Sequence, residues 1–241
     1  MPGGDLVASL AVLREATEKI SRAGAIAVVL GGDHSIASAD VAGIANHLGH
    51  GKISMIHFDA HADTGEDQWG ALVGHGTPMR RLIDEGYVRG DKFLQLGLRG
   101  YWPDNKTLMW MRDQGMRSYE MTEIHHRGLK EVLDESFATL TDGCDGVFLS
   151  VDIDVVDPGM APGTGTPEPG GMTSRELLEA VRRICLELPV VGIDVVEVAP
   201  AFDTADITAI LANRVVLEAL SAIAKRRNGS AYDPKQNLLD R

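Results

Sequence analysis

Short apolar runs alternate with amphipathic stretches along the whole chain. The apolar runs and one shorter β-rich segment predict strands at residues 25–30, 53–58, 93–98, 117–120, 147–151 and 190–196. Between them, apolar residues at helical spacing predict helices at residues 6–21, 36–48, 77–85, 105–114, 123–140, 174–188 and 206–225. This alternation predicts an α/β fold, with a mostly parallel sheet between two layers of helices.

Glycine, proline and acidic residues mark the loops. They predict loops at residues 64–74 and 159–171, and Ser174 stands where the following helix needs an N-cap. We find no internal repeat or linker, so we expect residues 1–241 to form a single domain. The polar tail after Arg227 is expected to be frayed.

The composition excludes several classes of protein. A 44% hydrophobic and 24% charged chain is typical of soluble globular proteins, and the net charge of −12 argues against a nucleic-acid partner. We see no apolar run approaching membrane-spanning length and no signal peptide, so we expect no membrane association. Two distant cysteines, Cys144 and Cys185, fit a reduced, cytoplasmic protein.

Three candidate metal ligands follow the strand at 53–58 at alternate positions. They are Asp59, His61 and Asp63. Side chains at i, i+2 and i+4 of an extended segment point to one side, so the three converge just beyond the strand. The carboxyl ends of parallel strands are where open α/β sheets bind ligands.

Two other strands end in the same kind of chemistry. Asp152 and Asp154 follow the strand at 147–151, and His34 follows two glycines after the strand at 25–30. Four carboxylates gathered at one place repel each other and lose hydration, and bound cations are the usual remedy. Six ligands exceed one zinc site and suit two octahedral ions. Oxygen-rich ligation favours Mn²⁺, although Ni²⁺ or Co²⁺ would also bind.

Three motifs together resemble the signatures of the ureohydrolases, the family of arginase, agmatinase and related guanidino hydrolases. They are Gly-Gly-Asp-His-Ser at 31–35, Phe-Asp-Ala-His-Ala-Asp at 58–63 and Ser-Val-Asp-Ile-Asp-Val-Val-Asp-Pro at 150–158. The resemblance covers about residues 20–225 and implies a three-layer α/β/α fold with a binuclear manganese site.

The resemblance also implies which of the two ions each ligand would bind. One ion would take His34 and Asp63, the other His61 and Asp154, and Asp59 and Asp152 would bridge them. A hydroxide held between the ions would be the nucleophile, since two cations bring the pKa of bound water into the neutral range.

The family likeness assigns the substrate residues as well. Glu197 would clamp the guanidinium group, His75 would shuttle protons near the substrate, Asp63 would pass a proton to the leaving amine, and Thr166 would shape the pocket. Tyr101 and Trp102 are further candidates for the pocket wall. The remaining histidines are interpreted as structural or surface residues: His47, His50, His57, His125 and His126.

Within the family, the 159–167 loop and the Val-Glu-Val-Ala-Pro segment resemble agmatinases most, which implies agmatine as substrate and putrescine and urea as products. Hydrolysis of 4-guanidinobutyrate or another guanidino acid is the first alternative. An inactive metal-binding partner subunit is the second, and His75 and Glu197 argue against it. A one-zinc hydrolase such as a deacetylase is disfavoured by the six ligands.

The N-terminal region departs from the family pattern. Family members usually carry several tens of residues before the Gly-Gly-Asp-His-Ser motif, whereas 30 precede it here. We therefore expect the first strand of the family sheet to be missing, with an exposed sheet edge. The family likeness also implies a homo-oligomer, either a trimer or a hexamer.

Overall fold

The computed structural model describes residues 4–229 and 233. Its strands are β1 Ala27–Leu30, β2 Ile53–Phe58, β3 Val88–Leu98, β4 Arg117–Glu120, β5 Gly146–Asp152 and β6 Val190–Val196. Its α-helices are α1 Leu6–Arg22, α2 Ala37–Leu48, α3 Pro78–Asp84, α4 Asn105–Asp113, α5 Met121–Arg127, α6 Leu129–Thr141, α7 Ser174–Glu187 and α8 Ile207–Arg227. Short 3₁₀ turns lie at His34–Ile36, Ile153–Val155 and Pro200–Phe202.

The strands form one sheet in the order β1-β6-β5-β2-β3-β4, and every described pairing is parallel. The register aligns the strand ends, since Leu30 pairs with Val195, and Val151 pairs with both Val195 and Phe58. The residues that follow β1, β6, β5 and β2 are therefore neighbours at one edge of the sheet.

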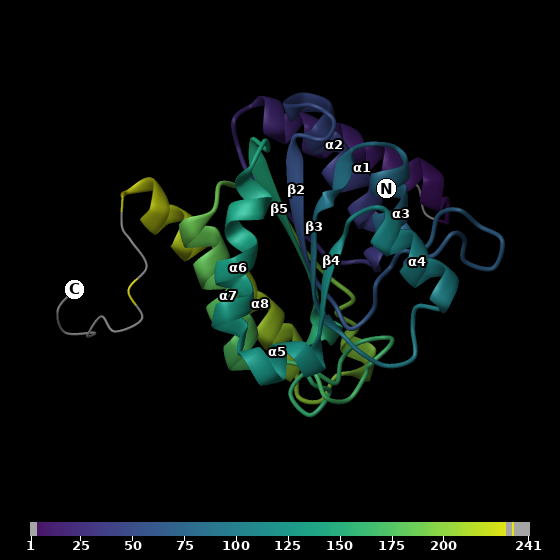
Figure 1. Ribbon diagram of the computed structural model, residues 1–241, viewed down its shortest axis with the longest axis vertical. Coiled ribbons are helices and arrows are strands. Elements are labelled where there is room, and N and C mark those ends of the chain that lie inside the picture. Colours follow the sequence, from purple (N-terminus) through teal and green to yellow (C-terminus); the bar gives the residue numbers. More distant parts are fainter. Residues whose placement is uncertain (1–3, 230–232, 234–241) are drawn as a thin grey trace.

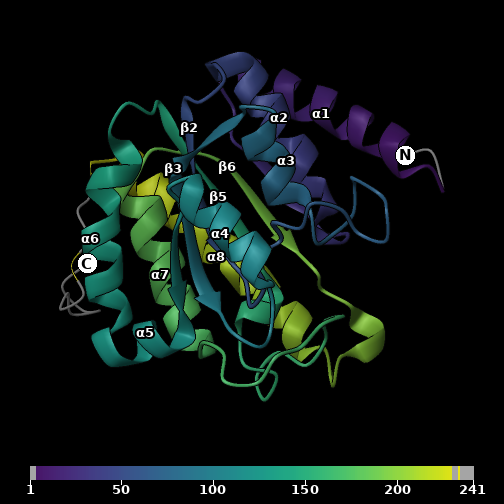
Figure 2. The same ribbon diagram turned by 45° about the vertical axis from the view of Figure 1, so that its right-hand side comes forward.

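The helices cover both faces of the sheet, which confirms the predicted three-layer fold. Helices α1 to α4 lie on one side and α5 to α8 on the other (Figures 1 and 2). Successive strand residues serve opposite faces, so Met55 packs under α2 while Ile56 belongs to the core under α6 and α7. Each large apolar side chain buried in this way contributes about 1.5–3 kcal/mol.

Two local predictions are wrong. The helix expected at 123–140 is divided into α5 and α6 at Gly128, whose φ of 85° and ψ of 136° end the helical hydrogen-bond ladder. The N-cap of α7 is Thr173 rather than Ser174: Thr173 Oγ1 accepts from the Glu176 N–H at 3.2 Å, and the Glu176 carboxylate accepts from the Thr173 N–H at 2.7 Å. The tail expected to be frayed lies almost entirely outside the described residues.

The expectation that no segment approaches membrane-spanning length also fails for α8. Its 21 residues are long and apolar enough by length and composition alone. The helix nevertheless carries Arg214 and Glu218, and Glu218 forms an ion pair with Arg182 of α7 at 2.7 Å. A helix of a soluble protein can pass the same test of length and composition, so we assign no membrane role to α8.

Candidate metal centre

Four adjacent strand ends supply the side chains of the site. β1 leads into His34, β2 into Asp59, β5 into Asp152 and β6 into Glu197. The strand ends are tied together, because the Glu197 N–H donates to the Gly32 carbonyl at 3.0 Å. Gly32 has a φ of 76°, a left-handed conformation that glycine adopts without strain.

Two site residues other than glycine also have left-handed backbones. Asp63 has a φ of 52° and Glu197 a φ of 62°. Such conformations cost about 1–3 kcal/mol each and persist where the surrounding structure enforces them, often at functional sites. Here these two conformations turn the backbone sharply at Asp63 and at Glu197, beside the carboxyl edge of the sheet.

His34 forms the first half of a buried cluster. Its Nδ1 atom lies 3.1 Å from Asp59 Oδ2, 3.1 Å from Asp63 Oδ2 and 3.2 Å from Asp152 Oδ2. The His34 side chain is fully buried, and no N–H or hydroxyl donor within the described part of the chain reaches Nδ1. Neighbouring ligands of one six-coordinate ion with bonds of about 2.1 Å are about 3 Å apart, so this spacing fits a metal site.

His61 forms the second half. Its Nδ1 atom lies 3.0 Å from Asp154 Oδ2 and 3.4 Å from Asp59 Oδ1. Asp59 thus turns one carboxylate oxygen toward His34 and the other toward His61. Asp152 faces His34 with Oδ2, while its Oδ1 accepts from the Asp154 N–H at 2.9 Å. The structure therefore brings all six predicted ligands together, and the cluster is able to bind metal.

The charges of the cluster influence one another strongly in the metal-free protein. Burial alone would lower the pKa of His61, yet hydrogen bonds to Asp154 and Asp59 raise it to about 11. Burial and the charge of Asp59 raise the pKa of Asp63 to about 7. Burial likewise raises the pKa of Asp152 well above its ordinary range. This frustration of buried like charges is what bound cations relieve.

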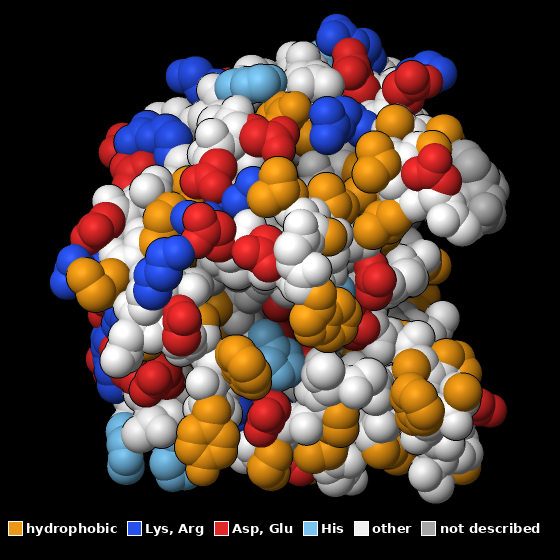
Figure 3. All heavy atoms as spheres, turned by 90° about the vertical axis from the view of Figure 1, so that its right-hand side faces the viewer, with side chains coloured by type: hydrophobic (Ala, Val, Ile, Leu, Met, Phe, Trp, Pro, Cys, Tyr) orange, Lys and Arg blue, Asp and Glu red, His pale blue; other side chains and the backbone are white. Residues whose placement is uncertain are grey.

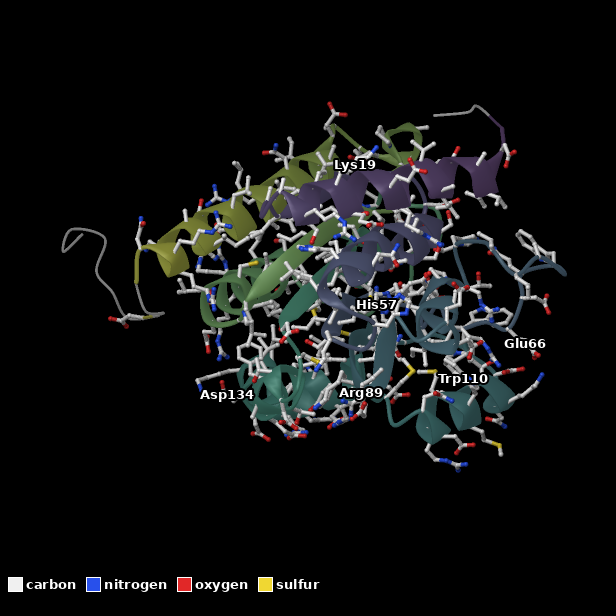
Figure 4. All side chains as sticks on the ribbon, turned by 90° about the horizontal axis from the view of Figure 1, so that it is seen from above. Lys19, His57, Glu66, Arg89, Trp110 and Asp134 are labelled. Atoms are coloured by element: carbon white, nitrogen blue, oxygen red, sulfur yellow. The ribbon has the colours of Figure 1, made fainter. Side chains whose placement is uncertain are left out.

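His57 is a site residue that the sequence analysis missed. It is fully buried in the interior of the protein (Figure 4), and its Nε2 lies 2.8 Å from Asp59 Oδ2. The Gln95 amide donates to His57 Nδ1 at 3.1 Å and to the Ala62 carbonyl at 2.7 Å. Since Nδ1 is an acceptor, Nε2 carries the hydrogen and donates to Asp59. His57 therefore orients Asp59, and neither of its nitrogens is available as a ligand.

Arg99 is a second missed residue. Its guanidinium donates to the carbonyls of Asp154 at 2.7 Å and Glu168 at 2.7 Å, and also to Val155 at 3.2 Å. It thereby fastens the 159–171 loop to the ends of β3 and β5. Thr166 of this loop donates to Asp154 Oδ2 at 3.3 Å.

A pocket of about 860 Å³ opens beside the cluster. Site residues and loop residues line it together: His61, Asp63, Glu66, Asp67, Trp69, His75, Trp102, Asp104, Lys106, Asp152, Thr166, Glu168 and Glu197. Tyr101 is 98% exposed and does not belong to the lining, unlike its neighbour Trp102. Figure 3 shows a face on which histidine side chains lie in a recess among acidic and hydrophobic groups.

Glu197 and His75 face each other in this pocket. Glu197 Oε1 lies 4.0 Å from His75 Nδ1 and accepts from the His34 N–H at 2.8 Å. Burial raises the pKa of Glu197, and the His34 N–H lowers it in part. The other histidines lie elsewhere: His47 bonds to Ser21, His50 packs on Tyr87, and His125 lies against His126 on α5.

Comparisons with known proteins agree with this geometry. The chain is 39% identical over 213 residues to a mitochondrial agmatinase of Gallus gallus, covering 88% of this chain and 61% of that protein. It is 35% identical to a guanidinobutyrase of Pseudomonas aeruginosa, covering 91% of this chain and 67% of that protein. The chain thus spans about three fifths to two thirds of the length of these relatives.

The solved structure of formimidoylglutamase from Bacillus subtilis superposes with a TM-score of 0.88 at 33% identity, covering 92% of this chain and 69% of that one. The family model described as the arginase family matches residues 1–222. With the parallel sheet and the clustered ligands at its carboxyl edge, this match shows that the chain belongs to the arginase family.

Proposed function

We propose that this protein is a binuclear metal hydrolase that cleaves a guanidino compound to urea and an amine. The observation that carries the proposal is the position of Asp59, whose two oxygens face two separate histidine-carboxylate groups. One ion would be held by His34 and Asp63, and the other by His61 and Asp154. Asp59 and Asp152 would be shared.

Manganese is the ion that the donor set favours. Four carboxylates and two imidazoles form an oxygen-rich set, which suits Mn²⁺ better than Zn²⁺. When bound, the two ions would supply Lewis acidity and an activated water molecule at neutral pH.

The protein's own residues would then position the substrate. Glu197 is negatively charged when ionised and lies beside the cluster, so it would bind the guanidinium nitrogens and orient the central carbon. His75 is partly exposed at the pocket wall, where it would exchange protons with solvent. Asp63 would carry a proton toward the leaving nitrogen.

Hydrolysis needs one water molecule for each bond cleaved. The water oxygen bonds to the guanidinium carbon, the bond from that carbon to the alkyl-bearing nitrogen breaks, and the two protons of the water pass to the leaving nitrogen, which departs as an alkylammonium ion. The products are urea and a primary amine.

The charge of the pocket favours agmatine as the substrate. Besides Glu197, four carboxylates lie in the lining outside the cluster: Glu66, Asp67, Asp104 and Glu168. Lys106 is the one lysine or arginine among the lining residues, and it is paired with Glu66. The pocket lining outside the cluster therefore carries excess negative charge, which attracts the ammonium tail of agmatine and repels a carboxylate tail. Putrescine would be the amine product.

Guanidino-acid hydrolysis is the second candidate. Lys106 reaches the pocket lining and offers a cation for a substrate carboxylate, provided that it leaves Glu66. The similarity to a guanidinobutyrase supports this alternative.

Urea release by the manganese-loaded protein decides between these candidates. Agmatine and 4-guanidinobutyrate are compared at equal concentration, with Asp152→Ala as the control that removes a shared ligand. We expect faster release from agmatine and none from the control. Preference for 4-guanidinobutyrate would transfer the assignment to guanidino acids, and the absence of release from both, with ions bound, would refute the proposed function.

A further inference from the structure

Two buried carboxyl groups face each other behind the metal cluster. Asp40 on α2 and Asp194 on β6 have no exposed surface, and their carboxyl groups lie close enough for each to shift the pKa of the other. The Oδ2 atom of each is buried, and no N–H or hydroxyl donor within the described part of the chain reaches it. Two carboxylates cannot hydrogen-bond to each other unless one of them carries a proton.

The surroundings decide which carboxyl holds the proton. Asp194 Oδ1 accepts from Ser150 Oγ at 2.7 Å and from the Val151 N–H at 3.2 Å, and both bonds favour its ionised form. Among the described residues, Asp40 accepts a hydrogen bond from the Val41 N–H at 2.6 Å and from no other donor. Burial and the charge of Asp194 raise the pKa of Asp40 well above its ordinary range. Asp40 is therefore the neutral acid and Asp194 the carboxylate.

The pair is connected to the cluster through one hydroxyl group. The Ser150 hydroxyl donates its hydrogen to Asp194, so the Ser150 oxygen is an acceptor for His34 Nε2, which lies 2.8 Å away. His34 Nε2 then carries a hydrogen. The opposite nitrogen, Nδ1, is the atom that points at Asp59, Asp63 and Asp152.

We propose that Asp40 is a positioning residue, which shares one proton with Asp194 and, through Asp194 and Ser150, holds His34 with Nδ1 open to a metal ion. The metal role of His34 rests on the proposed function. Without the Asp40 hydrogen, Asp194 keeps a buried oxygen without a donor, and burial then favours uptake of a proton by Asp194 itself. A protonated Asp194 is a weaker acceptor for Ser150. A reversed Ser150 hydroxyl would donate to Nε2 and place the imidazole hydrogen on Nδ1, where it blocks the metal.

The first experiment looks for the proton in the metal-free full chain by infrared difference spectroscopy. The spectrum of the wild type minus that of Asp40→Asn should contain the carbonyl stretch of a buried protonated carboxylic acid, whereas bands from Asp63 and Asp152 are common to both proteins and cancel. If the difference spectrum contains no such band, the assignment of the proton to Asp40 is overturned.

The second experiment measures binding of Mn²⁺ alone by calorimetry. Asp40→Leu, which has no donor, should weaken binding about 10- to 100-fold, as loss of outer-shell partners usually does. Asp40→Asn is the matched control: its amide N–H still donates to Asp194, so its affinity should stay within about threefold of the wild type. Equal affinities of Asp40→Leu and the wild type would overturn the proposal.

A double-mutant cycle separates positioning from a general structural role. Ser150→Ala breaks the only described link from the acid pair to His34 and should weaken Mn²⁺ binding as Asp40→Leu does. If Asp40 acts through Ser150, the double variant should bind no more weakly than Ser150→Ala. Additive losses would show that Asp40 acts by another route and would overturn the proposal.

The outcomes also separate this inference from the proposed function. If Asp40→Leu does not fold, Asp40→Asn and Ser150→Ala still give the carbonyl band and the Mn²⁺ affinities that decide the question. If the wild type binds no Mn²⁺, the proposed function fails and the metal-positioning role of Asp40 fails with it, whereas the carbonyl band still tests where the proton lies. Turnover is needed for none of these measurements.

Discussion

The carboxylate of Glu197 accepts a hydrogen bond from the backbone N–H of His34, with 2.8 Å between Glu197 Oε1 and the nitrogen. The bond joins the residue after β6 to the residue that opens the turn after β1. One residue thereby offers both an anchor to the strand-end framework and a charged group to the pocket, where it lies 4.0 Å from His75 Nδ1.

Replacing Glu197 by Gln separates these two roles. Gln keeps an oxygen that accepts from the His34 N–H but loses the negative charge that would bind a guanidinium. We expect kcat/KM for agmatine to fall by about 10²–10³, the range seen when one preorganised electrostatic partner is lost at a reacting group. Steady-state urea release measures the change, and Mn²⁺ stoichiometry serves as the control. Activity within a few fold of the wild type would rule out the clamp.

Metal binding should release protons. In the metal-free protein the pKa of His61 is raised to about 11, so its imidazole is protonated near neutral pH and must lose that proton to bind an ion. The same holds for His34, whose pKa lies well above its ordinary range because hydrogen bonds to Asp152, Asp59 and Asp63 outweigh its burial.

We therefore expect at least about two protons released per chain near neutral pH, two of them from these histidines, and an apparent Mn²⁺ affinity that rises with pH. Below about pH 7 protonation of Asp63 adds to the competition, so affinity should fall more steeply there. Calorimetry in two buffers of different ionisation enthalpy gives the proton count. A count near zero would mean that these histidines are not ligands.

The ligand positions could be predicted because the ligands lie at or just beyond the ends of strands. The expected extended segment after Phe58 is wrong, since residues 60 and 61 form a bend and Asp63 has a left-handed backbone. Asp59, His61 and Asp63 converge through this turn at the end of β2. Parallel pairing of β1, β6, β5 and β2 brings in the remaining ligands without any long-range information beyond strand order.

The sequence could not indicate contacts between residues of different strands and helices. His57 lies inside an apolar strand and resembles a core residue there, since its partner Gln95 comes from the neighbouring strand β3. Asp40 lies within α2, where an acidic residue would ordinarily face solvent, and only the packing of α2 on β6 reveals its burial. Gly128 is a different case. A single glycine is often tolerated within a helix, so the sequence did not indicate that the helix expected at 123–140 is divided there.

The cap of α7 provides a test of a local interaction. Thr173→Ala removes the oxygen that accepts from the Glu176 N–H, and we expect it to lower the free energy of unfolding by about 1 kcal/mol. Ser174→Ala is the matched control: it removes a similar hydroxyl at the first helical position, and its effect should be within about 0.5 kcal/mol of zero. Urea unfolding followed by circular dichroism compares the two. A larger loss for Ser174→Ala would restore Ser174 as the cap.

The acidic residues that line the pocket should make it prefer a substrate with a positively charged tail. Glu168→Gln removes one negative charge from the lining while keeping a side chain of similar size. Because Glu168 is partly exposed, solvent weakens its attraction for an ammonium group, and we expect KM for agmatine to rise by up to about fivefold. KM for 4-guanidinobutyrate should stay constant or fall, since the same charge repels its carboxylate.

Glu131→Gln on α6 is the control for this change, because it removes the same charge from the helical layer away from the pocket lining. It should leave both KM values unchanged, and kcat should be preserved in both variants because neither residue belongs to the cluster. If Glu168→Gln raised KM equally for both substrates, the residue would shape the pocket without reading the charge of the tail. Selection would then have to come from the aromatic wall that includes Trp102.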